Sequence, residues 1–172
     1  GVTYHNKGDY DRAIADYTKA IQLDPENGLY YEQRGVSHHS KGDYNRAVTD
    51  FDKAIQLDPE QADYYWGRGV TYNKKGDCDR AIADYSKAIQ LDPGKVDYYW
   101  ERGKSYGWKN DHDRAITDYS KAIQLDPGKA DYYWGRGVSY HFQGDYDRAI
   151  ADYTKAIQLD PENGLNYQQR GV

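Results

Sequence analysis

The sequence predicts an all-α solenoid built from antiparallel helix pairs. The first observation is a regular period of 34 residues, which is the step from Gly35 to Gly69. Gly-Val pairs mark this period and begin at Gly1, Gly35, Gly69, Gly137 and Gly171. The second is the block Ala-Ile-Gln-Leu-Asp-Pro, which recurs in one frame and ends at Pro25, Pro59, Pro93, Pro127 and Pro161. A fixed period of this length indicates stacked supersecondary units rather than a single globular core.

The first helix of each unit is predicted from residue spacing, and residues 62–95 serve as the example. The stretch from Asp63 to Lys75 contains no proline, and Tyr65, Gly69 and Tyr72 recur in it at helical spacing. Gly76 follows this stretch and is expected to end the helix.

The second helix of the same unit is predicted from Cys78 to Leu91, with Asp77 before it as the N-cap. Its apolar stripe lies at i, i+4, i+7 and i+8, which is typical of an amphipathic helix, and consists of Ala81, Tyr85, Ala88 and Ile89. Pro93 ends the helix because proline disfavours the α conformation in the residue before it. A single helix pair cannot bury its apolar face alone, so each unit needs a neighbour.

The repeat phase predicts one array over residues 1–172. Its full units are 28–61, 62–95, 96–129 and 130–163, residues 1–27 lack the start of their first helix, and residues 164–172 begin a further first helix. Solenoids usually carry polar capping helices, and none is recognised at either end. This favours a piece of a longer array over a module that stacks head to tail through its ends.

Composition excludes several classes of partner. The formal net charge is −5 with acids and bases interleaved, so no basic stripe is present to bind a nucleic-acid backbone. The mean hydropathy is −1.11, and the chain has no long apolar run that could enter a membrane. We expect a soluble protein, and the cytoplasm is favoured over secretion although the compartment stays open.

The signature residues resemble those of the tetratricopeptide repeat (TPR) family over the whole chain. The family pattern is an aromatic residue, Gly-x-x-Tyr, Ala-x-x-x-aromatic-x-x-Ala and then proline. Here it reads Tyr65, Gly69, Tyr72, Ala81, Tyr85, Ala88 and Pro93. It returns as Tyr99, Gly103, Tyr106, Ala115, Tyr119, Ala122 and Pro127, and as Tyr133, Gly137, Tyr140, Ala149, Tyr153, Ala156 and Pro161.

One departure from the family pattern is systematic. The family usually has leucine before the signature glycine, whereas this chain has Arg34, Arg68, Arg102, Arg136 and Arg170. Another position is always aspartate, at Asp16, Asp50, Asp84, Asp118 and Asp152. We predict that each arginine pairs with an aspartate of the second helix, because a half-buried guanidinium needs a partner. The alternative is that the arginine head reaches water over its aliphatic stem.

The resemblance implies a right-handed superhelix whose first helices line a concave groove that binds a peptide. The first helices present four columns of inward positions, at spacings of three, four and three residues. They are Leu29, Asp63, Asp97 and Asp131; Glu32, Trp66, Trp100 and Trp134; Val36, Val70, Lys104 and Val138; and His39, Asn73, Gly107 and His141. All of these except Leu29 and Gly107 are taken as groove residues.

Trp66, Trp100 and Trp134 form the most distinctive column, since each tryptophan follows an aspartate by one turn. Tryptophan edged by carboxylates suits a partner with apolar and basic side chains, through cation–π contact and charge pairing. The alternative is that the indoles lie against the next repeat as core. Trp108 and Phe142 either extend the same apolar wall or pack near the loops.

The sequence predicts a protein–protein interaction scaffold, without catalysis, cofactor or metal site. No nucleophile–base set converges, and adjacent helices are about 8–10 Å apart, so His5 and His39 are too far apart to share a zinc ion. The clamp of basic and amide residues with which some TPR domains hold an acidic C-terminal peptide is not expected, because the columns carry Asp and Trp. The alternative function is a self-assembly module that stacks end to end.

Overall fold

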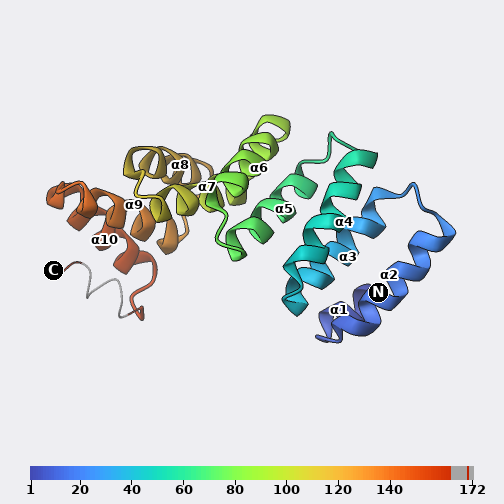
Figure 1. Ribbon diagram of the computed structural model, residues 1–172. Helices are drawn as coiled ribbons and strands as arrows, with labels where there is room; N and C mark the ends of the chain where they lie inside the picture. Colours follow the sequence, from blue (N-terminus) through green and yellow to red (C-terminus); the bar gives the residue numbers. More distant parts are fainter. Residues whose placement is uncertain (164–169, 171–172) are drawn as a thin grey trace. The chain divides into compact units, whose positions relative to one another are not determined.

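The computed structural model describes residues 1–163 and residue 170 (Figure 1). The chain divides into two compact units, Gly1–Pro93 and Gly94–Val172, each of which is described separately. Every regular element in the described residues is an α-helix, which confirms the predicted all-α class. The predicted start of a further helix at 164–172 lies, apart from Arg170, outside the described residues.

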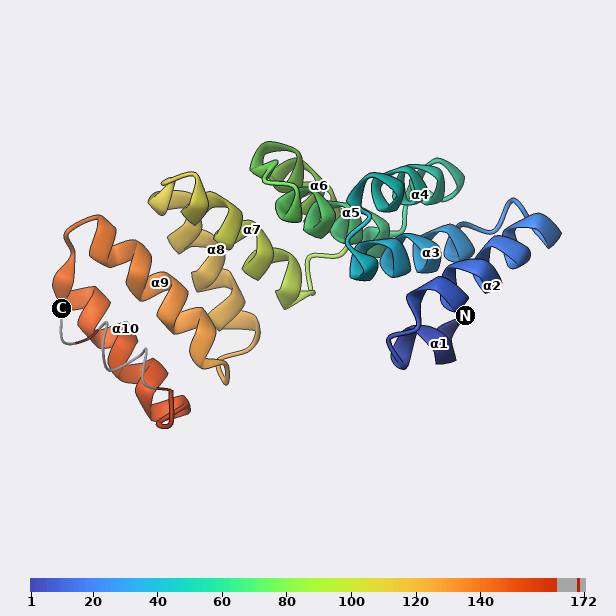
Figure 2. The same ribbon diagram turned by 60° about the horizontal axis from the view of Figure 1, so that its bottom comes forward.

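The first unit contains three helix pairs. The elements are α1 (Val2–Asn6), α2 (Tyr10–Leu23), α3 (Gly28–Lys41), α4 (Tyr44–Leu57), α5 (Ala62–Lys74) and α6 (Cys78–Leu91). Helix α3 packs along α4 and α5 packs along α6, which Figures 1 and 2 both show. Each second helix also packs on the first helix of the next pair, so that α2 contacts α3 and α4 contacts α5.

The second unit repeats this arrangement with two pairs. They are α7 (Val96–Trp108) with α8 (His112–Leu125), and α9 (Ala130–Phe142) with α10 (Tyr146–Leu159). Helix α8 packs on α9, and the two first helices, α7 and α9, also contact one another. This last contact places one side of both first helices on a common face.

Side-chain caps fix the start of each second helix. Asp77 accepts a hydrogen bond from the backbone N–H of Arg80, as its predicted N-cap role requires, and the helix ends at Leu91 as expected. Helix α5 starts and ends one residue earlier than predicted. The turn after it needs a left-handed residue, supplied by Gly76, and Asn110 takes the same conformation in the second unit with φ of 59°.

Alanine and tyrosine form the core between the helices. Ala81, Tyr85 and Ala88 are completely buried in α6. A methyl group added to Gly69 would lie 2.7 Å from the Tyr85 ring, so the signature glycine is needed for close approach of the two helices. Buried tyrosine in place of leucine explains how a chain of such low mean hydropathy folds.

The predicted arginine–aspartate pairs are present in four repeats. In each pair the guanidinium donates twice to one carboxylate: Arg34 to Asp50, Arg68 to Asp84, Arg102 to Asp118, and Arg136 to Asp152, at 2.6–2.9 Å. The four aspartates are buried, so the pairing interpretation is confirmed over the one in which arginine extends into water.

A third guanidinium N–H links successive repeats. Arg34 donates to Thr18, Arg68 to Asp52 and Arg136 to Ser120, each on the second helix of the preceding repeat. The hydrogen bond to Asp50 raises the pKa of Arg34, and Asp152 does the same for Arg136. Arg34, Arg68 and Arg136 therefore each tie their own repeat together and link it to the preceding one.

No helix of the described residues is long and apolar enough to cross a membrane. The boundaries predicted for the individual repeats stay a prediction.

Candidate interaction site

A cavity of about 670 Å³ opens between α7 and α9 in the second unit. The start of α8 closes one end of it. Its wall consists of Trp100, Lys104, Gly107, Trp108, Asn110, His112, Tyr119, Asp131, Trp134, Gly135, Val138, Ser139 and Phe142. This volume is in the range of pockets that hold small ligands or single anchoring side chains.

Six of the thirteen residues of the cavity wall carry an aromatic ring. Trp100 packs against Tyr119 and Tyr132, with ring centroids 5.3 and 5.2 Å apart, and these two contacts restrain the orientation of its ring. Trp108 and Phe142 stand at the ends of α7 and α9 and are 60% and 67% exposed. Such large apolar side chains exposed beside a cavity are typical of a surface that binds a partner.

The chain places its own cation over the tryptophan rings. The Lys104 ammonium lies 5.5 Å from the ring centroid of Trp100 and 6.0 Å from that of Trp108. It also pairs with Glu101 at 2.7 Å. Because like charges repel in such a partly enclosed site, a second cation on these ring faces is disfavoured.

Two nitrogen atoms of the wall are buried without a hydrogen bond. Among the residues that the structure describes, the Trp134 indole N–H and the Nδ1 atom of His112 have no partner. The His112 ring stacks on Phe142 at 5.0 Å. Because both atoms are shielded from solvent, neither belongs to the accessible surface of the cavity.

Five of the predicted groove residues of the second unit line this cavity. They are Trp100, Lys104, Asp131, Trp134 and Val138. Asp97 is exposed in the first turn of α7, where the helix dipole favours an acid, and Asp131 stands likewise in α9. His141 is half-buried, and its ring packs on Tyr146 at 5.4 Å outside the cavity.

None of the predicted groove residues of the first unit lines the cavity between α7 and α9. Trp66 and Val70 pack against a buried cluster around Tyr85, although both stay half-buried rather than enclosed. Asn73 donates to the Tyr85 hydroxyl, and His39 bonds Thr71 on the next first helix. Val36 and Glu32 are half-buried and Asp63 is exposed.

The burial of Glu32 on α3 can be tested through the pH dependence of the free energy of unfolding. Burial raises its pKa, the hydrogen bond from the Gln33 amide lowers it, and the Asp63 charge raises it. A carboxyl whose pKa is higher in the folded state destabilises that state when ionised. Glu32→Gln should therefore increase the free energy of unfolding at neutral pH, by less than about 1 kcal/mol.

The gain should shrink as the pH falls through the raised pKa and vanish below the ordinary value of 4.5, where both states are protonated. Urea unfolding at a series of pH values measures it, and Asp63→Asn is the exposed control. A constant difference between Glu32→Gln and the unmodified protein from neutral to acid pH would contradict this assignment.

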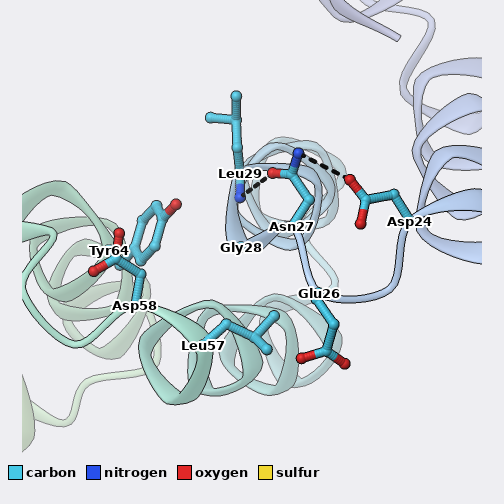
Figure 3. A pocket seen from close by; sticks show the side chains of 8 residues that line it. All are labelled: Asp24, Glu26, Asn27, Gly28, Leu29, Leu57, Asp58 and Tyr64. Carbon is cyan, nitrogen blue, oxygen red and sulfur yellow. Dashed lines mark hydrogen bonds between the residues drawn. The ribbon is translucent and has the colours of Figure 1, made fainter.

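Figure 3 shows a second cavity, of about 460 Å³, in the first unit. Its lining is polar, and the Asn27 side chain accepts from the N–H of Leu29 while donating to Asp24. Asn27 is the N-cap of α3, so capping accounts for these contacts. No group of three metal-ligating side chains occurs in the described part of the chain. We assign this cavity no binding role.

Several wall residues were not predicted from the sequence. Tyr119 is a signature packing residue of the repeat pattern, Gly135 and Ser139 were assigned no role, and Gly107 was not among the groove residues. The sequence signal for this space was Gly107 itself. The same column holds histidine or asparagine in the other repeats, at His5, His39, Asn73 and His141.

Comparisons with known proteins agree with this architecture. A family profile described as TPR repeat matches residues 1–42, 37–76, 71–107 and 109–144, and one described as tetratricopeptide repeat matches residues 130–163. The search of the curated proteins returned no match.

Three solved structures illustrate the likeness. MamA is 29% identical, with 93% of this chain and 94% of that chain covered and a TM-score of 0.87. YrrB, described as a TPR protein with an unusual peptide-binding site, is 24% identical, with coverages of 99% and 88% and a TM-score of 0.86. MamA from Desulfovibrio magneticus RS-1, residues 41 to the end, is 22% identical, with coverages of 94% and 92% and a TM-score of 0.87.

The family profiles match nearly all of the chain, and the helix pairs of both units match solved TPR solenoids. Proteins of this kind generally act as non-catalytic scaffolds for protein–protein interaction. The chain belongs to the tetratricopeptide repeat family.

Proposed function

We propose that the face of α7 and α9 that carries Trp100 and Trp134 binds a peptide segment of a partner protein. The observation that supports it most is the aromatic cavity between these helices, beside which Trp108 and Phe142 are exposed. A peptide supplies apolar side chains that such a wall can bury.

The charges of the cavity select among partner segments. Lys104 already occupies the ring faces of Trp100 and Trp108, so the group that enters the cavity is uncharged. Basic side chains of the same partner fit the exposed carboxylates of Asp97 and Asp131 in the first turns of α7 and α9. The sequence predicted a partner with apolar and basic side chains. In this proposal the apolar side chains enter the cavity, and the basic side chains bind at its edge.

The proposed role is binding without catalysis. Lys104 is paired with Glu101, and His112 is stacked on Phe142. Neither side chain is therefore positioned as a general base that activates a nucleophile. No cofactor or metal enters the proposal.

A peptide-library screen tests the proposed function, with selected peptides compared across variants. Trp100→Ala should weaken binding at least about tenfold, because central aromatic residues dominate interface energies. Trp134→Phe keeps a ring but removes part of the apolar indole surface, and should weaken binding by about three- to tenfold. Trp66→Phe in the first unit is the matched control and should bind as the unmodified protein does.

Circular dichroism and the unfolding midpoint of each variant establish that it is folded. Equal affinities of the unmodified protein and folded Trp100→Ala and Trp134→Phe would refute the assignment of the site. Failure of the library to yield any binder would count against peptide binding itself.

Self-assembly is the alternative function, and the exposure of Tyr146 and Ile150 on α10 favours it. A second copy of the chain could cover these side chains. Light scattering over a concentration series separates the two functions, because self-assembly predicts a mass that rises with concentration, whereas a constant monomer mass contradicts it.

A further inference from the structure

Two repeats of the first unit show what fits between successive first helices. Nδ1 of His5, on α1, lies 3.1 Å from the Ser37 hydroxyl on α3. Nδ1 of His39, on α3, lies 3.0 Å from the Thr71 hydroxyl on α5. Both contacts join residues that are 32 positions apart, so an imidazole occupies the same slot twice.

The proton positions in these contacts follow from the hydroxyl groups. Ser37 donates its only O–H to the carbonyl oxygen of Gln33, and Thr71 donates to that of Gly67. Each hydroxyl can therefore only accept from the histidine, so Nδ1–H is the donor. Burial lowers the pKa of His39, which keeps that ring in the neutral form. The slot thus holds a neutral imidazole that donates to a hydroxyl oxygen.

The imidazole has an aromatic neighbour at the start of the following helix. The His5 ring packs on Tyr10 at 5.2 Å, and the His39 ring packs on Tyr44 at 5.3 Å. A hydroxyl on one side and an aromatic ring on the other therefore define the slot in the first unit.

The corresponding slot between α7 and α9 lacks its imidazole. Gly107 stands where His39 would be, and Ser139 stands 32 residues later in place of Thr71. Ser139 donates to the carbonyl oxygen of Gly135, but within the described part of the chain no N–H group donates to its oxygen. His112 stands where Tyr44 would be, and all three residues line the cavity.

We propose that the cavity at Gly107 is a subsite for a neutral imidazole, the histidine side chain of a bound peptide, which replaces the side chain that this repeat lacks. Its ring N–H donates to the Ser139 hydroxyl oxygen. Its other ring nitrogen is an acceptor that stays open to water or to an N–H group of the peptide. The proposal rests on the proposed peptide-binding function, because it names the side chain that anchors the peptide.

The other features of the cavity agree with this guest. Lys104 disfavours a cationic side chain such as lysine or arginine. A purely apolar ring would leave the Ser139 oxygen without a donor. Gly107 leaves room, since a methyl group built on it would meet only the Tyr119 hydroxyl, at 3.7 Å.

The direct test uses 4-methylimidazole, which reproduces the histidine side chain, at about pH 9, where the ring is neutral. Titration is followed by nuclear magnetic resonance of the tryptophan indole N–H groups. Saturable shifts of Trp134 are expected, with a dissociation constant on the order of 1–10 mM. The ring 1-methylimidazole, which lacks the N–H donor, should bind at least about fivefold more weakly.

Two variants at one position make the test specific. Gly107→His supplies the missing side chain and should abolish the shifts, while Gly107→Ala leaves the slot open and should keep them. Ser139→Ala removes the acceptor and should weaken 4-methylimidazole binding about five- to tenfold. Absence of saturable shifts in the unmodified protein, or equal shifts in folded Gly107→His, would overturn the subsite.

Peptides from the library screen separate this inference from the proposed function. Selected peptides should carry a histidine, whose replacement by alanine weakens binding to the unmodified protein but not to Gly107→His. If selected peptides require Trp100 and Trp134 but show no preference for histidine, the subsite is wrong and the proposed function stands. If 4-methylimidazole binds as described but no peptide does, the proposed function fails and the cavity is specific for the ring alone.

Discussion

Asp152→Ala is expected to lower the free energy of unfolding by about 3 kcal/mol, because removing one partner of a buried ion pair leaves the other uncompensated. The Asp152 side chain is 8% exposed and accepts from both Nε and Nη2 of Arg136 at 2.8 Å. Arg136 also donates to Ser120 on the preceding second helix. Loss of Asp152 therefore weakens the packing of α9 against both α10 and α8.

The control for this prediction is an ion pair of the same chemistry on the surface. Arg148 pairs with Asp145 on the exposed side of α10. Arg148→Ala should have a much smaller effect than Asp152→Ala, since exposed ion pairs contribute little. Equilibrium unfolding in urea measures both variants, and equal losses would contradict the role given to the buried pair.

Gly137→Ala is expected to lower the free energy of unfolding by about 2 kcal/mol through overpacking. A methyl group at this position would lie 2.8 Å from the Tyr153 ring and 3.3 Å from Cβ of Asp152. Neither neighbour can yield easily, because Tyr153 is buried in the core and Asp152 is held by Arg136.

Gly107→Ala is the matched control, since this glycine also lies inside a first helix. The added methyl group would meet only the Tyr119 hydroxyl at 3.7 Å, and alanine is a better helix former than glycine by up to about 1 kcal/mol. Gly107→Ala should therefore be neutral or stabilising. Thermal unfolding compares the two, and similar midpoints would show that the signature glycine is not needed for close helix approach.

The helix pairs and their ion pairs were predictable from the sequence because each repeat carries the same local signals. The aspartate before each second helix and the proline after it mark the helix ends in every period. The arginine column was equally readable, since a guanidinium at a half-buried position needs an acceptor and one aspartate recurs at a constant distance from it.

The binding face could be predicted only in part. The spacing rule placed Trp100, Lys104 and Trp134 on one side of their helices, and all three line one cavity. It treated His39 and His141 as equivalent to them, yet His39 bonds Thr71 and His141 packs on Tyr146. Residue spacing gives the direction of a side chain, but not whether the next repeat offers it a partner.

The cavity itself arises from an absent side chain, which periodicity does not reveal. Gly107 interrupts a column of histidine and asparagine, and the neighbouring rings do not close the gap. Its wall also needs Gly135, where a methyl group would lie 3.0 Å from Tyr119 and 3.1 Å from Trp100. Only the packing of α7, α8 and α9 shows that these two glycines border the same space.

The central claim is that a partner peptide occupies the face of α7 and α9 that carries Trp100 and Trp134. The chain has four tryptophans, so its indole N–H resonances can be followed individually while a library-selected peptide is added. The claim predicts saturable shifts of the Trp100 and Trp134 resonances, because both rings line the occupied cavity. A peptide that saturates the protein while both resonances stay unmoved would contradict it.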